Sequence, residues 1–372
     1  MKILVINWQD IKNPLGGGAE VHFHEIFKRI AARGHQVTLF CSRFPDSPEQ
    51  EIIDGIRILR QGSRNLFNYS VYPRYKRQFS KEKYDVVVDD INKIPFYTPL
   101  FVKEPLAGIV HHLFGKSIFS EASLPAALYV YGAERMALPV YRNIPIAVVS
   151  ESTKKEMVSL GFKPEDLMLA PNAVHHQLFR VTGIQRSESP LIGYLGRIKK
   201  YKSVDHLLYA FALVVKQIPD ARLVVVGDGD ALDGLKHLAG TLGIGHAVEF
   251  TGYVSEEKKV EWLNTVQLAV NPSAKEGWGL TVIEANACGI PVIASDVPGL
   301  RDSVVNGKTG ILFEYGNINM LAEQIIAVLR DLTLRQRLSA EALLWAKTFN
   351  WESSADMMLD VLRTAIERHR KR

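Results

Sequence analysis

Cysteine is scarce in this chain, and long apolar runs are absent from it. The two cysteines, Cys41 and Cys288, are too few for a disulfide framework. No apolar run approaches the roughly 20 residues that cross a bilayer. The opening MKILVINWQD is strand-like and lacks the cleavage pattern of a secretory signal. We therefore expect a protein of the reducing cytoplasm, in which both cysteines pack as small apolar side chains.

The composition is that of a soluble globular protein, and the length predicts two domains. Hydrophobic residues make up 47% of the chain and charged residues 23%, a balance typical of soluble proteins. A chain of 372 residues is too long for one ordinary core. The net charge of +5 comes from 45 basic and 40 acidic residues, and this excess alone does not indicate nucleic acid as a partner.

The stretch from residue 57 to residue 83 is rich in basic residues, with aromatic residues among them. A solvated basic surface is the simpler interpretation. A patch for anionic lipid headgroups or for an anionic acceptor is the alternative. The basic residues are Arg57, Arg60, Arg64, Arg74, Lys76, Arg77, Lys81 and Lys83, and the aromatic residues are Phe67, Tyr69, Tyr72, Tyr75 and Phe79.

Apolar strand patterns alternate with helical patterns along the chain. KILVINW (2–8) is a buried strand pattern, and AEVHFHEIFKRIAARG (19–34) has the apolar spacing of a helix that ends at Gly34. Continuous apolar strands between helices predict parallel sheets covered on both faces. The polar segment 181–190 is the best linker candidate. We predict an α/β protein of two Rossmann-like βαβ domains, residues 1–185 and 186–350. If their strand ends face each other, they form a central cleft.

A glycine cluster, NPLGGGAEVH (13–22), separates the first strand from the first helix. Glycines let a backbone approach a ligand closely, and helix N-terminal amides favour an anion. A plain tight turn is the alternative. Neither this cluster nor GDGDAL (227–232) completes a dinucleotide fingerprint, because Val21 and Leu232 occupy the third glycine position. This disfavours a dehydrogenase.

Cations follow the first strand of the second domain in LGRIKKYKS (195–203). Arg197 offers a planar fork for phosphate oxygens, and Lys202 a mobile point charge. Side chains at the end of a central strand face the ligand side of the sheet. We interpret Arg197 and Lys202 as diphosphate-binding residues, and Lys199 and Lys200 as surface charges.

Two carboxylates flank a glycine turn in EGWGLTVIEANACGIPVIASD (276–296). Glu276 lies in the loop, and Glu284 on a helix expected from about Gly279 to Cys288. The pair suggests either general acid and base chemistry or two acceptors that hold one extended ligand. The spacing alone does not establish a hydrolase pair. Glu284 needs a polar partner, because the surrounding helix is apolar.

Two histidines, His111 and His112, end the strand GIVHHLFG (108–115). Successive strand residues point to opposite faces, so one histidine can face a ligand while the other packs or meets solvent. No His, Cys and Asp cluster has zinc spacing, and Asp89 with Asp90 would make only a weak metal site. We predict no bound metal.

The chain resembles a family 4 retaining glycosyltransferase (glycosyl transferases group 1) of GT-B architecture. The resemblance covers nearly the whole chain and is stronger in the second domain. Arg197 and Lys202 with the Glu-x₇-Glu stretch are its specific part. The matching segments are GGGAE (16–20), VSES (149–152), PNAV (171–174), GRIKKYK (196–202), GDG (227–229), EGWGLTVIEANACGIPVIAS (276–295) and FNWESSA (349–355).

The resemblance implies a role for each matching residue. His111 would lie near the reactive carbon of the transferred sugar, although His112 stands where the family often has Asp or Gln, which leaves the assignment of the two histidines open. Glu276 would hold hydroxyls of that sugar, and Glu284 the ribose. Implied catalytic residues are His111, Glu276, Arg197 and Lys202. Implied donor-binding residues are Gly17, Gly18, Arg197, Lys202, Gly227, Gly277, Gly279, Leu280 and Glu284.

The resemblance also implies a reaction: a hexose moves from a nucleoside diphosphate sugar to a hydroxyl of a glycan or lipid-linked acceptor, in cell-surface polysaccharide or glycolipid biosynthesis. Retention of configuration, no cofactor or metal, and no nucleic acid partner are expected. The first domain would bind the acceptor, the second the nucleotide sugar, and a terminal helix (351–372) would pack back on the first domain. We expect a cytoplasmic enzyme, with an anionic membrane surface as a partner to be tested. The alternatives are a sugar-nucleotide epimerase of GT-B form and an inactive donor-binding scaffold.

Overall fold

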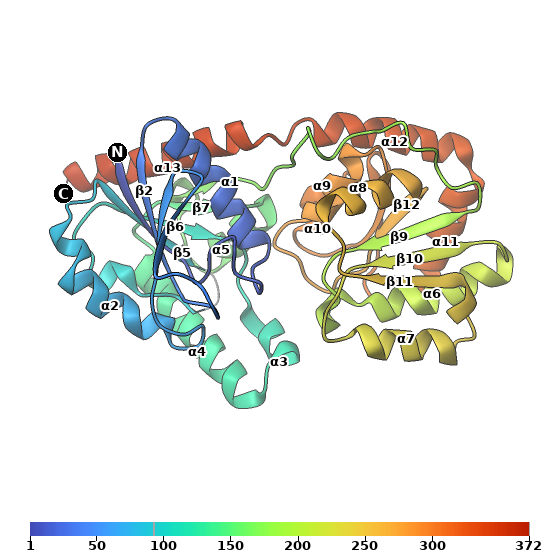
Figure 1. The fold of residues 1–372 in the computed structure, drawn as a ribbon, viewed down its shortest axis with the longest axis horizontal. Helices are drawn as coiled ribbons and strands as arrows, with labels where there is room; N and C mark the ends of the chain where they lie inside the picture. Colours follow the sequence, from blue (N-terminus) through green and yellow to red (C-terminus); the bar gives the residue numbers. More distant parts are fainter. Residues whose placement is uncertain (92–93, 372) are drawn as a thin grey trace. The chain divides into compact units, whose positions relative to one another are not determined.

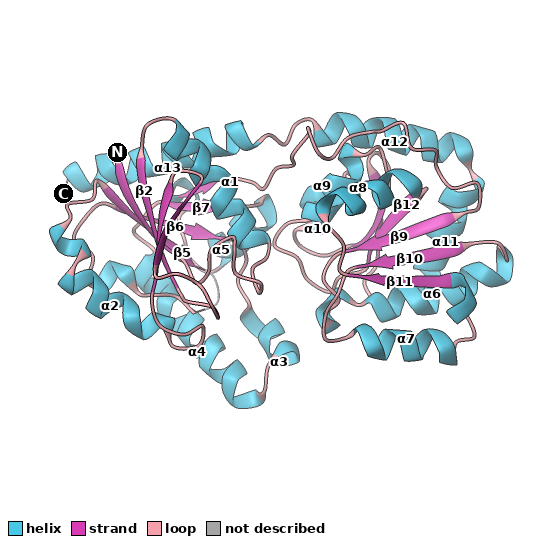
Figure 2. Cartoon of the chain, in the orientation of Figure 1, coloured by secondary structure: helices cyan, strands magenta, loops and turns pink. Residues whose placement is uncertain are grey.

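The computed structural model describes residues 1–91 and 94–371, without the side chains of residues 120 and 121. The chain divides into two compact units. Unit 1 comprises Met1–Asn172 and Trp351–Arg372, and unit 2 comprises Ala173–Asn350. Each unit is a sheet of parallel strands, with one antiparallel edge strand in unit 1, and has helices around it (Figures 1 and 2). No helix among the described residues has the length and apolar content needed to cross a bilayer.

Unit 1 contains an eight-stranded sheet in the order β3-β4-β2-β1-β5-β6-β7-β8. All neighbouring strands are parallel except β3 and β4. The strands are β1 (Lys2–Ile6), β2 (Gln36–Cys41), β3 (Gln50–Ile53), β4 (Ile56–Arg60), β5 (Val86–Ile91), β6 (Leu106–Val110), β7 (Ile146–Val148) and β8 (Leu167–Leu169). The helices are α1 (Gly18–Ala32), α2 (Phe67–Arg77), α3 (Ile118–Glu121), α4 (Leu124–Tyr141), α5 (Glu151–Ser159) and α13 (Trp351–Arg370).

Helix α1 shows how the sequence pattern becomes structure. Its buried apolar residues Phe23, Ile26, Phe27 and Ile30 recur at the spacing of one helix face. The helix ends at Ala32, slightly before the predicted Gly34, which takes the left-handed conformation (φ +86°) common after a helix end. Helix α13 packs on α1 within unit 1.

Unit 2 contains a six-stranded parallel sheet in the order β11-β10-β9-β12-β13-β14. Figure 1 shows α8, α9 and α12 on one side of this sheet and α6 and α7 on the other. The strands are β9 (Leu191–Leu195), β10 (Arg222–Val226), β11 (Val248–Gly252), β12 (Leu268–Asn271), β13 (Val292–Ser295) and β14 (Gly310–Phe313). The helices are α6 (Val204–Gln217), α7 (Leu232–Thr241), α8 (Glu256–Thr265), α9 (Leu280–Ala287), α10 (Leu300–Ser303), α11 (Ile318–Arg330) and α12 (Leu332–Ala346).

The division between the units falls at Asn172, before the predicted boundary at residue 185. The polar segment 181–190, interpreted from its sequence as a linker, is bonded to unit 2. The Thr182 amide donates to Asn264 Oδ1 (2.8 Å), and the Ser187 amide donates to the Thr265 carbonyl (2.9 Å). A polar segment can pack against a domain when a side chain such as Asn264 satisfies its backbone.

The basic and aromatic stretch from residue 57 to residue 83 is not one surface, which corrects its simple interpretation as a solvated or docking patch. Phe67, Tyr75 and Phe79 belong to the core of unit 1. Arg60 is also buried, whereas Tyr69 and Tyr72 are exposed. The helix α2 therefore turns one aromatic set inward and another outward, as a 3.6-residue period allows.

Candidate functional site

A turn after β9 in unit 2 presents Arg197, and a second turn after β10 holds it in place. The Gly196 amide donates to the Val226 carbonyl (3.0 Å), and the Ile198 amide to the Asp228 carbonyl (2.8 Å). Gly227 has φ +141°, and a Cβ there would lie 1.9 Å from Gly196 O. Gly227, predicted to bind the donor, thus has a clear packing role beneath the Arg197 turn.

Lys202 and Glu276 form an ion pair in unit 2, although they are 74 residues apart in the sequence. Lys202 Nζ lies 2.5 Å from Glu276 Oε1, and both side chains are mostly buried. The Ala274 amide donates to the Tyr201 carbonyl (2.8 Å), which joins the two loops. Ser273 Oγ lies 2.9 Å from the same Glu276 oxygen. Glu276 Oε2 is left to accept further hydrogen bonds.

The electrostatics of this pair include Arg197. Burial lowers the pKa of Lys202 and is the largest single effect, but the charge and hydrogen bond of Glu276, together with Tyr201, raise that pKa above its usual value, while Arg197 acts in the same direction as burial. Arg197 is exposed. Lys199 instead pairs with Asp230 (2.7 Å). Lys202 and Glu276 are thus paired in unit 2, and Arg197 lies close enough for its charge to act on Lys202.

The start of α9 lies just after Glu276 in the chain. Gly279 is the residue before the helix, and a Cβ there would lie 2.2 Å from Ser303 Oγ. Only glycine fits at this position without a shift. The first amides of a helix have no acceptor within it, so the amide of Leu280, and the loop containing Gly277, are available to an anion. The helix covers Leu280–Ala287, within the predicted range.

Glu284 has the polar partner that its apolar helix requires. Lys259 Nζ on α8 lies 2.8 Å from Glu284 Oε2. Burial raises the pKa of Glu284, although the charge of Lys259 opposes the rise. A ribose hydroxyl bound by Glu284 would therefore share the carboxylate with Lys259. Lys259 had no signal in the sequence beyond its place in the charged run EEKK.

In unit 1, His111 follows β6 and belongs to a buried chain of polar contacts. His111 Nε2 lies 3.0 Å from Asp90 Oδ1, and Asn7 Nδ2 donates to Asp90 Oδ2 (2.9 Å). A carboxylate only accepts, so His111 Nε2 carries the proton of this hydrogen bond. Asp90 had been considered from sequence only as part of a weak metal site; the structure makes it the partner that orients His111.

A second histidine, His22 on α1, lies beside His111. Their ring centroids are 5.0 Å apart in an edge-on arrangement, and His22 Nε2 donates to the Ala170 carbonyl (2.7 Å). Burial, helped by the charge of His111, lowers the pKa of His22 to about 3. His22 is therefore neutral at physiological pH and adds no charge beside His111.

Two further polar residues near these strand ends, His112 and Asp89, have surroundings unlike those of His111 and Asp90. His112 is half-buried, and its ring packs against Phe114 at 5.0 Å. Asp89 accepts hydrogen bonds from Thr98 (2.6 Å) and Tyr141 (2.5 Å), and burial raises its pKa to about 6. His111 thus has a buried carboxylate, Asp90, that orients its ring. No cluster of three or more His, Cys, Asp or Glu side chains within the described part of the chain is arranged to hold a metal.

The glycine loop before α1 is capped from within the helix. The Gly17 amide donates to Glu20 Oε2 (2.6 Å). A Cβ on Gly18 would meet nothing within 4 Å, so this position is open to a ligand. Of the two predicted glycines, Gly18 keeps its surroundings free, and Gly17 already uses its amide.

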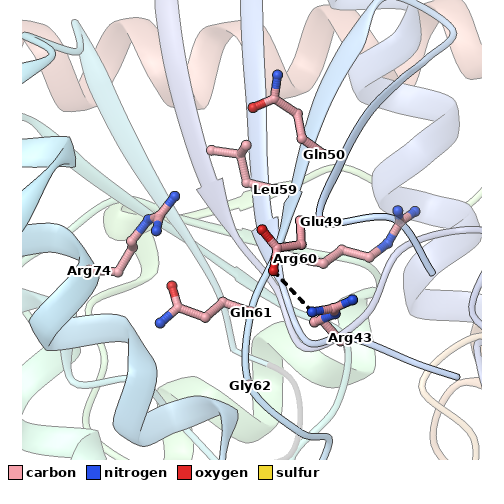
Figure 3. Close-up of a pocket in the computed structure, with 8 residues that line it drawn as sticks. All are labelled: Arg43, Glu49, Gln50, Leu59, Arg60, Gln61, Gly62 and Arg74. Carbon is pink, nitrogen blue, oxygen red and sulfur yellow. Dashed lines mark hydrogen bonds and ion pairs between the residues drawn. The ribbon is translucent and has the colours of Figure 1, made fainter. Parts of the chain in front are cut away.

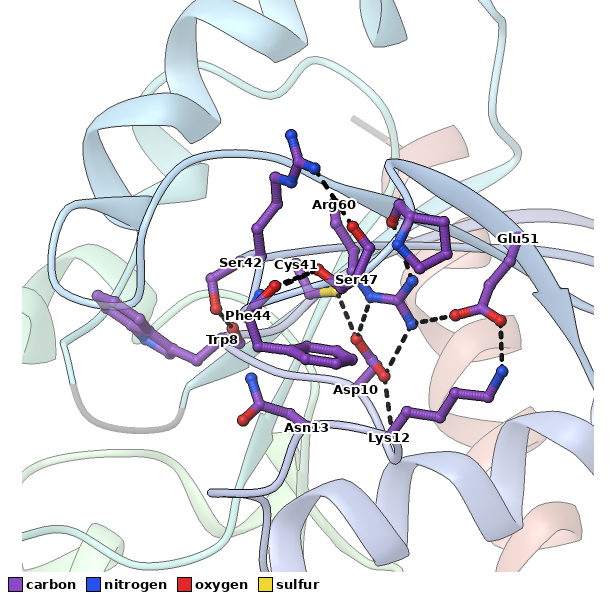
Figure 4. A network of polar contacts seen from close by, with 12 residues as sticks. Trp8, Asp10, Lys12, Asn13, Cys41, Ser42, Phe44, Ser47, Glu51 and Arg60 are labelled. Carbon is purple, nitrogen blue, oxygen red and sulfur yellow. Dashed lines mark hydrogen bonds and ion pairs between the residues drawn. The ribbon is translucent and has the colours of Figure 1, made fainter.

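A buried ion network holds the first part of the segment between β1 and α1, around Asp10 and Lys12 (Figure 4). The Arg60 side chain is fully buried, with Nε 2.6 Å from Asp10 Oδ2 and a terminal nitrogen 2.6 Å from Glu51 Oε1. Asp10 also accepts from the Lys12 amide (2.9 Å) and from Cys41 Sγ (3.4 Å). The base at position 60 therefore anchors the loop that leads into α1 and is not a surface charge.

A pocket of about 330 Å³ opens beside this network, at the carboxyl ends of β2 and β4 (Figure 3). Arg43 there pairs with Glu49 (3.1 Å), and Arg60 is held by Asp10 and Glu51. Arg74 from α2 completes the guanidinium groups of the lining. The lining residues are Arg43, Glu49, Gln50, Leu59, Arg60, Gln61, Gly62 and Arg74.

Two family models match successive parts of the chain: "Glycosyltransferase Family 4" over residues 16–178 and "Glycosyl transferases group 1" over residues 178–345. The chain belongs to this glycosyltransferase family. This glycosyltransferase is 27% identical to a D-inositol 3-phosphate glycosyltransferase of Thermomonospora curvata, over 93% of its own length and 90% of the relative's.

Solved structures agree on the fold of the glycosyltransferase. Sucrose-phosphate synthase from Thermosynechococcus elongatus has a TM-score of 0.83 and 23% identity, and the match covers 98% of both chains. HepE of Anabaena, solved in complex with UDP-glucose, has a TM-score of 0.77 and 19% identity, over 98% of this chain and 100% of that one. The fold is therefore GT-B, as predicted.

Proposed function

We propose that this glycosyltransferase moves a hexose from a nucleoside diphosphate sugar to a hydroxyl of a glycan or lipid-linked acceptor, with retention of configuration and without a metal. The proposed setting is polysaccharide or glycolipid biosynthesis on the cytoplasmic side of a membrane. The observation that carries the proposal is the group of Arg197, Lys202 and Glu276 in unit 2. UDP-glucose bound to the structurally similar HepE supports this donor class.

The contacts of Lys202 suit a diphosphate that becomes more negative as its bond to the sugar breaks. An ammonium group has three donors, so Lys202 can keep Glu276 and still bind a phosphate oxygen. Arg197 adds a second positive charge, and the first amides of α9 add hydrogen-bond donors with partial positive charge. Preorganised donors of this kind stabilise developing charge without rearranging. Such an arrangement supplies for the leaving group the stabilisation that a divalent cation supplies elsewhere.

Glu276 is proposed to hold the transferred sugar. Its Oε1 already contacts Lys202 and Ser273, so Oε2 is the atom that would accept sugar hydroxyls. In unit 1, His111, oriented by Asp90, is the residue proposed for catalysis. We propose that the acceptor hydroxyl attacks from the face that the phosphate leaves, and that its proton passes to that phosphate.

For the acceptor, we propose the guanidinium-lined pocket of unit 1. Arg74 is the lining base proposed to attract an anionic group of the acceptor, since Arg60 is neutralised by Asp10 and Glu51. The relative named for D-inositol 3-phosphate supports an acceptor with such a group. Arg74→Gln should then weaken acceptor use and leave donor binding unchanged.

The first test is a thermal-shift screen against UDP-glucose, UDP-galactose, UDP-N-acetylglucosamine and GDP-mannose. A donor at about 100 times its Kd should stabilise the folded protein by about 2.7 kcal/mol. Lys202→Met/Glu276→Gln should abolish the shift without leaving a lone buried charge, whereas Lys200→Met, at an exposed lysine, should retain it. A wild-type protein that responds to no nucleotide sugar would overturn the proposal.

The second test uses transfer. With the identified donor and a cell-extract acceptor, Lys202→Met should lower kcat by about a hundredfold or more, the effect of removing one preorganised donor. NMR of the product should show the anomeric configuration of the donor. Conversion of the donor without any acceptor would instead indicate an epimerase, and binding without transfer to any acceptor would indicate a scaffold. Either result contradicts the proposed reaction.

A further inference from the structure

Two neighbouring helices of unit 1, α2 and α4, expose large apolar side chains. Tyr69 is 64% exposed and Leu128 55%. On α4, Leu124 and Leu128 are four residues apart, so they lie on one face of the helix, and Met136 is exposed further along the same helix. The exposed members of this apolar face are Leu66, Tyr69, Tyr72, Leu124, Leu128 and Met136. Monomeric proteins rarely leave such a continuous face uncovered unless it binds something.

A direct contact shows that the two helices contribute to one surface. Tyr69 Oη of α2 lies 3.2 Å from Tyr129 Oη of α4, and Asn68 Nδ2 donates to the same hydroxyl (3.4 Å). Tyrosines with wet hydroxyls and apolar rings are typical of the boundary between water and hydrocarbon. The apolar face of α2 and α4 is therefore continuous, with tyrosines between its aliphatic residues.

Exposed positive charge accompanies this face on α2 and α4, and neither helix has an exposed carboxylate. Lys76, Arg77 and Arg135 are exposed on the same two helices, with Lys76 Nζ 5.8 Å from the centre of the Tyr72 ring. The two helices contain a single carboxylate, Glu134. Glu134 is buried and accepts from the amides of residues 114 and 115. An incoming surface therefore meets bases and no exposed carboxylate from α2 or α4.

The charges distinguish among the partners that an apolar face can have. A second copy of the chain would present the same face in a symmetric dimer, and so set bases against bases. A bilayer with anionic headgroups offers the opposite charge to the bases and an apolar layer to the tyrosines and leucines. The same combination does not fit a neutral membrane, which lacks the charge.

We propose that the apolar face of α2 and α4 docks unit 1 on an anionic lipid bilayer. The tyrosine and leucine side chains enter the headgroup region, and Lys76, Arg77 and Arg135 contact lipid phosphates. This inference rests on the proposed membrane location and deepens it. The test measures lipid binding alone. A failure to bind lipid would therefore leave the proposed sugar transfer untouched, and a failure of sugar transfer would leave the lipid proposal untouched.

The test is cosedimentation of the full chain with vesicles of phosphatidylcholine alone or mixed with phosphatidylglycerol. Only the anionic vesicles should bind the wild-type protein, and salt should weaken the binding. Each base near an anionic surface contributes about a fivefold change in partitioning, since about 1 kcal/mol per base is expected. Lys76→Gln/Arg77→Gln/Arg135→Gln should therefore bind on the order of a hundredfold more weakly.

A second variant addresses the apolar part. Tyr69→Ser/Leu128→Ser should bind to the anionic vesicles at least about tenfold more weakly, because the two apolar side chains no longer enter the apolar layer. Tyr253→Ser/Leu332→Ser removes a tyrosine that is more exposed than Tyr69 and a leucine as exposed as Leu128 from unit 2, and this variant should bind like the wild type. Circular dichroism and melting curves would show that all variants fold.

Three results would overturn the proposal. One is a wild-type protein that does not sediment with anionic vesicles at low salt. Another is equal loss of binding in the control variant of unit 2, which would mean that the face is not specific. The third is a concentration-dependent dimer abolished by Tyr69→Ser/Leu128→Ser, which would assign the face to a second copy of the chain.

Discussion

Replacing Arg60 by methionine should destabilise unit 1 strongly, even though Arg60 lies in a stretch that reads as basic surface. The Arg60 side chain has no solvent exposure and Asp10 has 1%. Arg60 bonds to both oxygens of Asp10 (2.6 and 3.0 Å), to Glu51 and to the Pro48 carbonyl (3.1 Å). The substitution leaves the Asp10 carboxylate buried without its counter-charge.

The magnitude follows from that burial. Breaking a buried ion pair from one side costs about 3–5 kcal/mol. For a unit of this size, each kcal/mol corresponds to roughly 2–4 °C in Tm, so the expected fall is roughly 6–20 °C. Asp10→Asn/Arg60→Met removes both charges and should recover much of this loss. Arg57→Met, on the same strand but with its charge 3.7 Å from Glu82 in a partly exposed pair, should cost about 1 kcal/mol or less.

Hydrogen exchange measured by mass spectrometry gives the readout for each unit separately. Peptides from β1, β2 and β4 should exchange faster in Arg60→Met, whereas peptides from β9 and β10 serve as an internal reference. If Arg60→Met costs no more than Arg57→Met, the network does not hold the loop before α1. If the double variant loses the sum of the two single losses, the pair is not coupled.

Three further variants test other contacts. The pKa of His22 is about 3 in the folded chain, against an ordinary 6.5. The unfolded state therefore binds one more proton, and the stability of the fold falls as the pH drops from about 6.5 toward 3. His22→Gln should reduce this loss of stability between pH 7 and pH 5 in denaturant titrations, and an unchanged loss would contradict the prediction. Gly227→Ala should destabilise unit 2 by at least about 3 kcal/mol, because its Cβ would lie 1.9 Å from a carbonyl oxygen. Gly234→Ala, in open space within α7, should instead increase the stability of unit 2 by about 0.5–1 kcal/mol. Equal melting temperatures for the two variants would refute this prediction. Lys259→Met should destabilise unit 2 by roughly 3 kcal/mol, because Glu284 is left buried without its counter-charge. If Lys259→Met/Glu284→Gln regains none of this stability, the two residues are not coupled.

Much of the candidate site follows from simple rules about parallel sheets. Arg197 and Lys202 follow one strand and Glu276 follows another, and the carboxyl ends of parallel strands share one edge of a sheet. That rule predicts their proximity without any knowledge of distances. The need of Glu284 for a partner also follows, since a carboxylate in an apolar helix is costly alone. The partner itself, Lys259, does not follow.

Pairings between distant elements had no local signal. The approach of Asp90 to His111 depends on the order β5-β6 in the sheet, and that of Asp10 to Arg60 on the order β4-β2-β1 and on the loop that follows β1. Neither pairing leaves a periodic pattern. The sequence of α4, LPAALYVYGAERMALPVY, has the composition of a buried helix, yet several of its large residues are exposed. Composition reports how apolar a helix is, and not which face is covered.

By itself the sequence determined the α/β class, the two parallel sheets, the family resemblance and the cations placed after β9, because buried strands and strand-end ligand residues impose patterns over a few neighbouring positions. The tertiary structure decided which charges neutralise one another, which aromatics of α2 are core, where the chain divides, and that α2 and α4 share an exposed face. These depend on contacts between residues far apart in the chain, whose energies are set by burial and distance and leave no trace in local spacing.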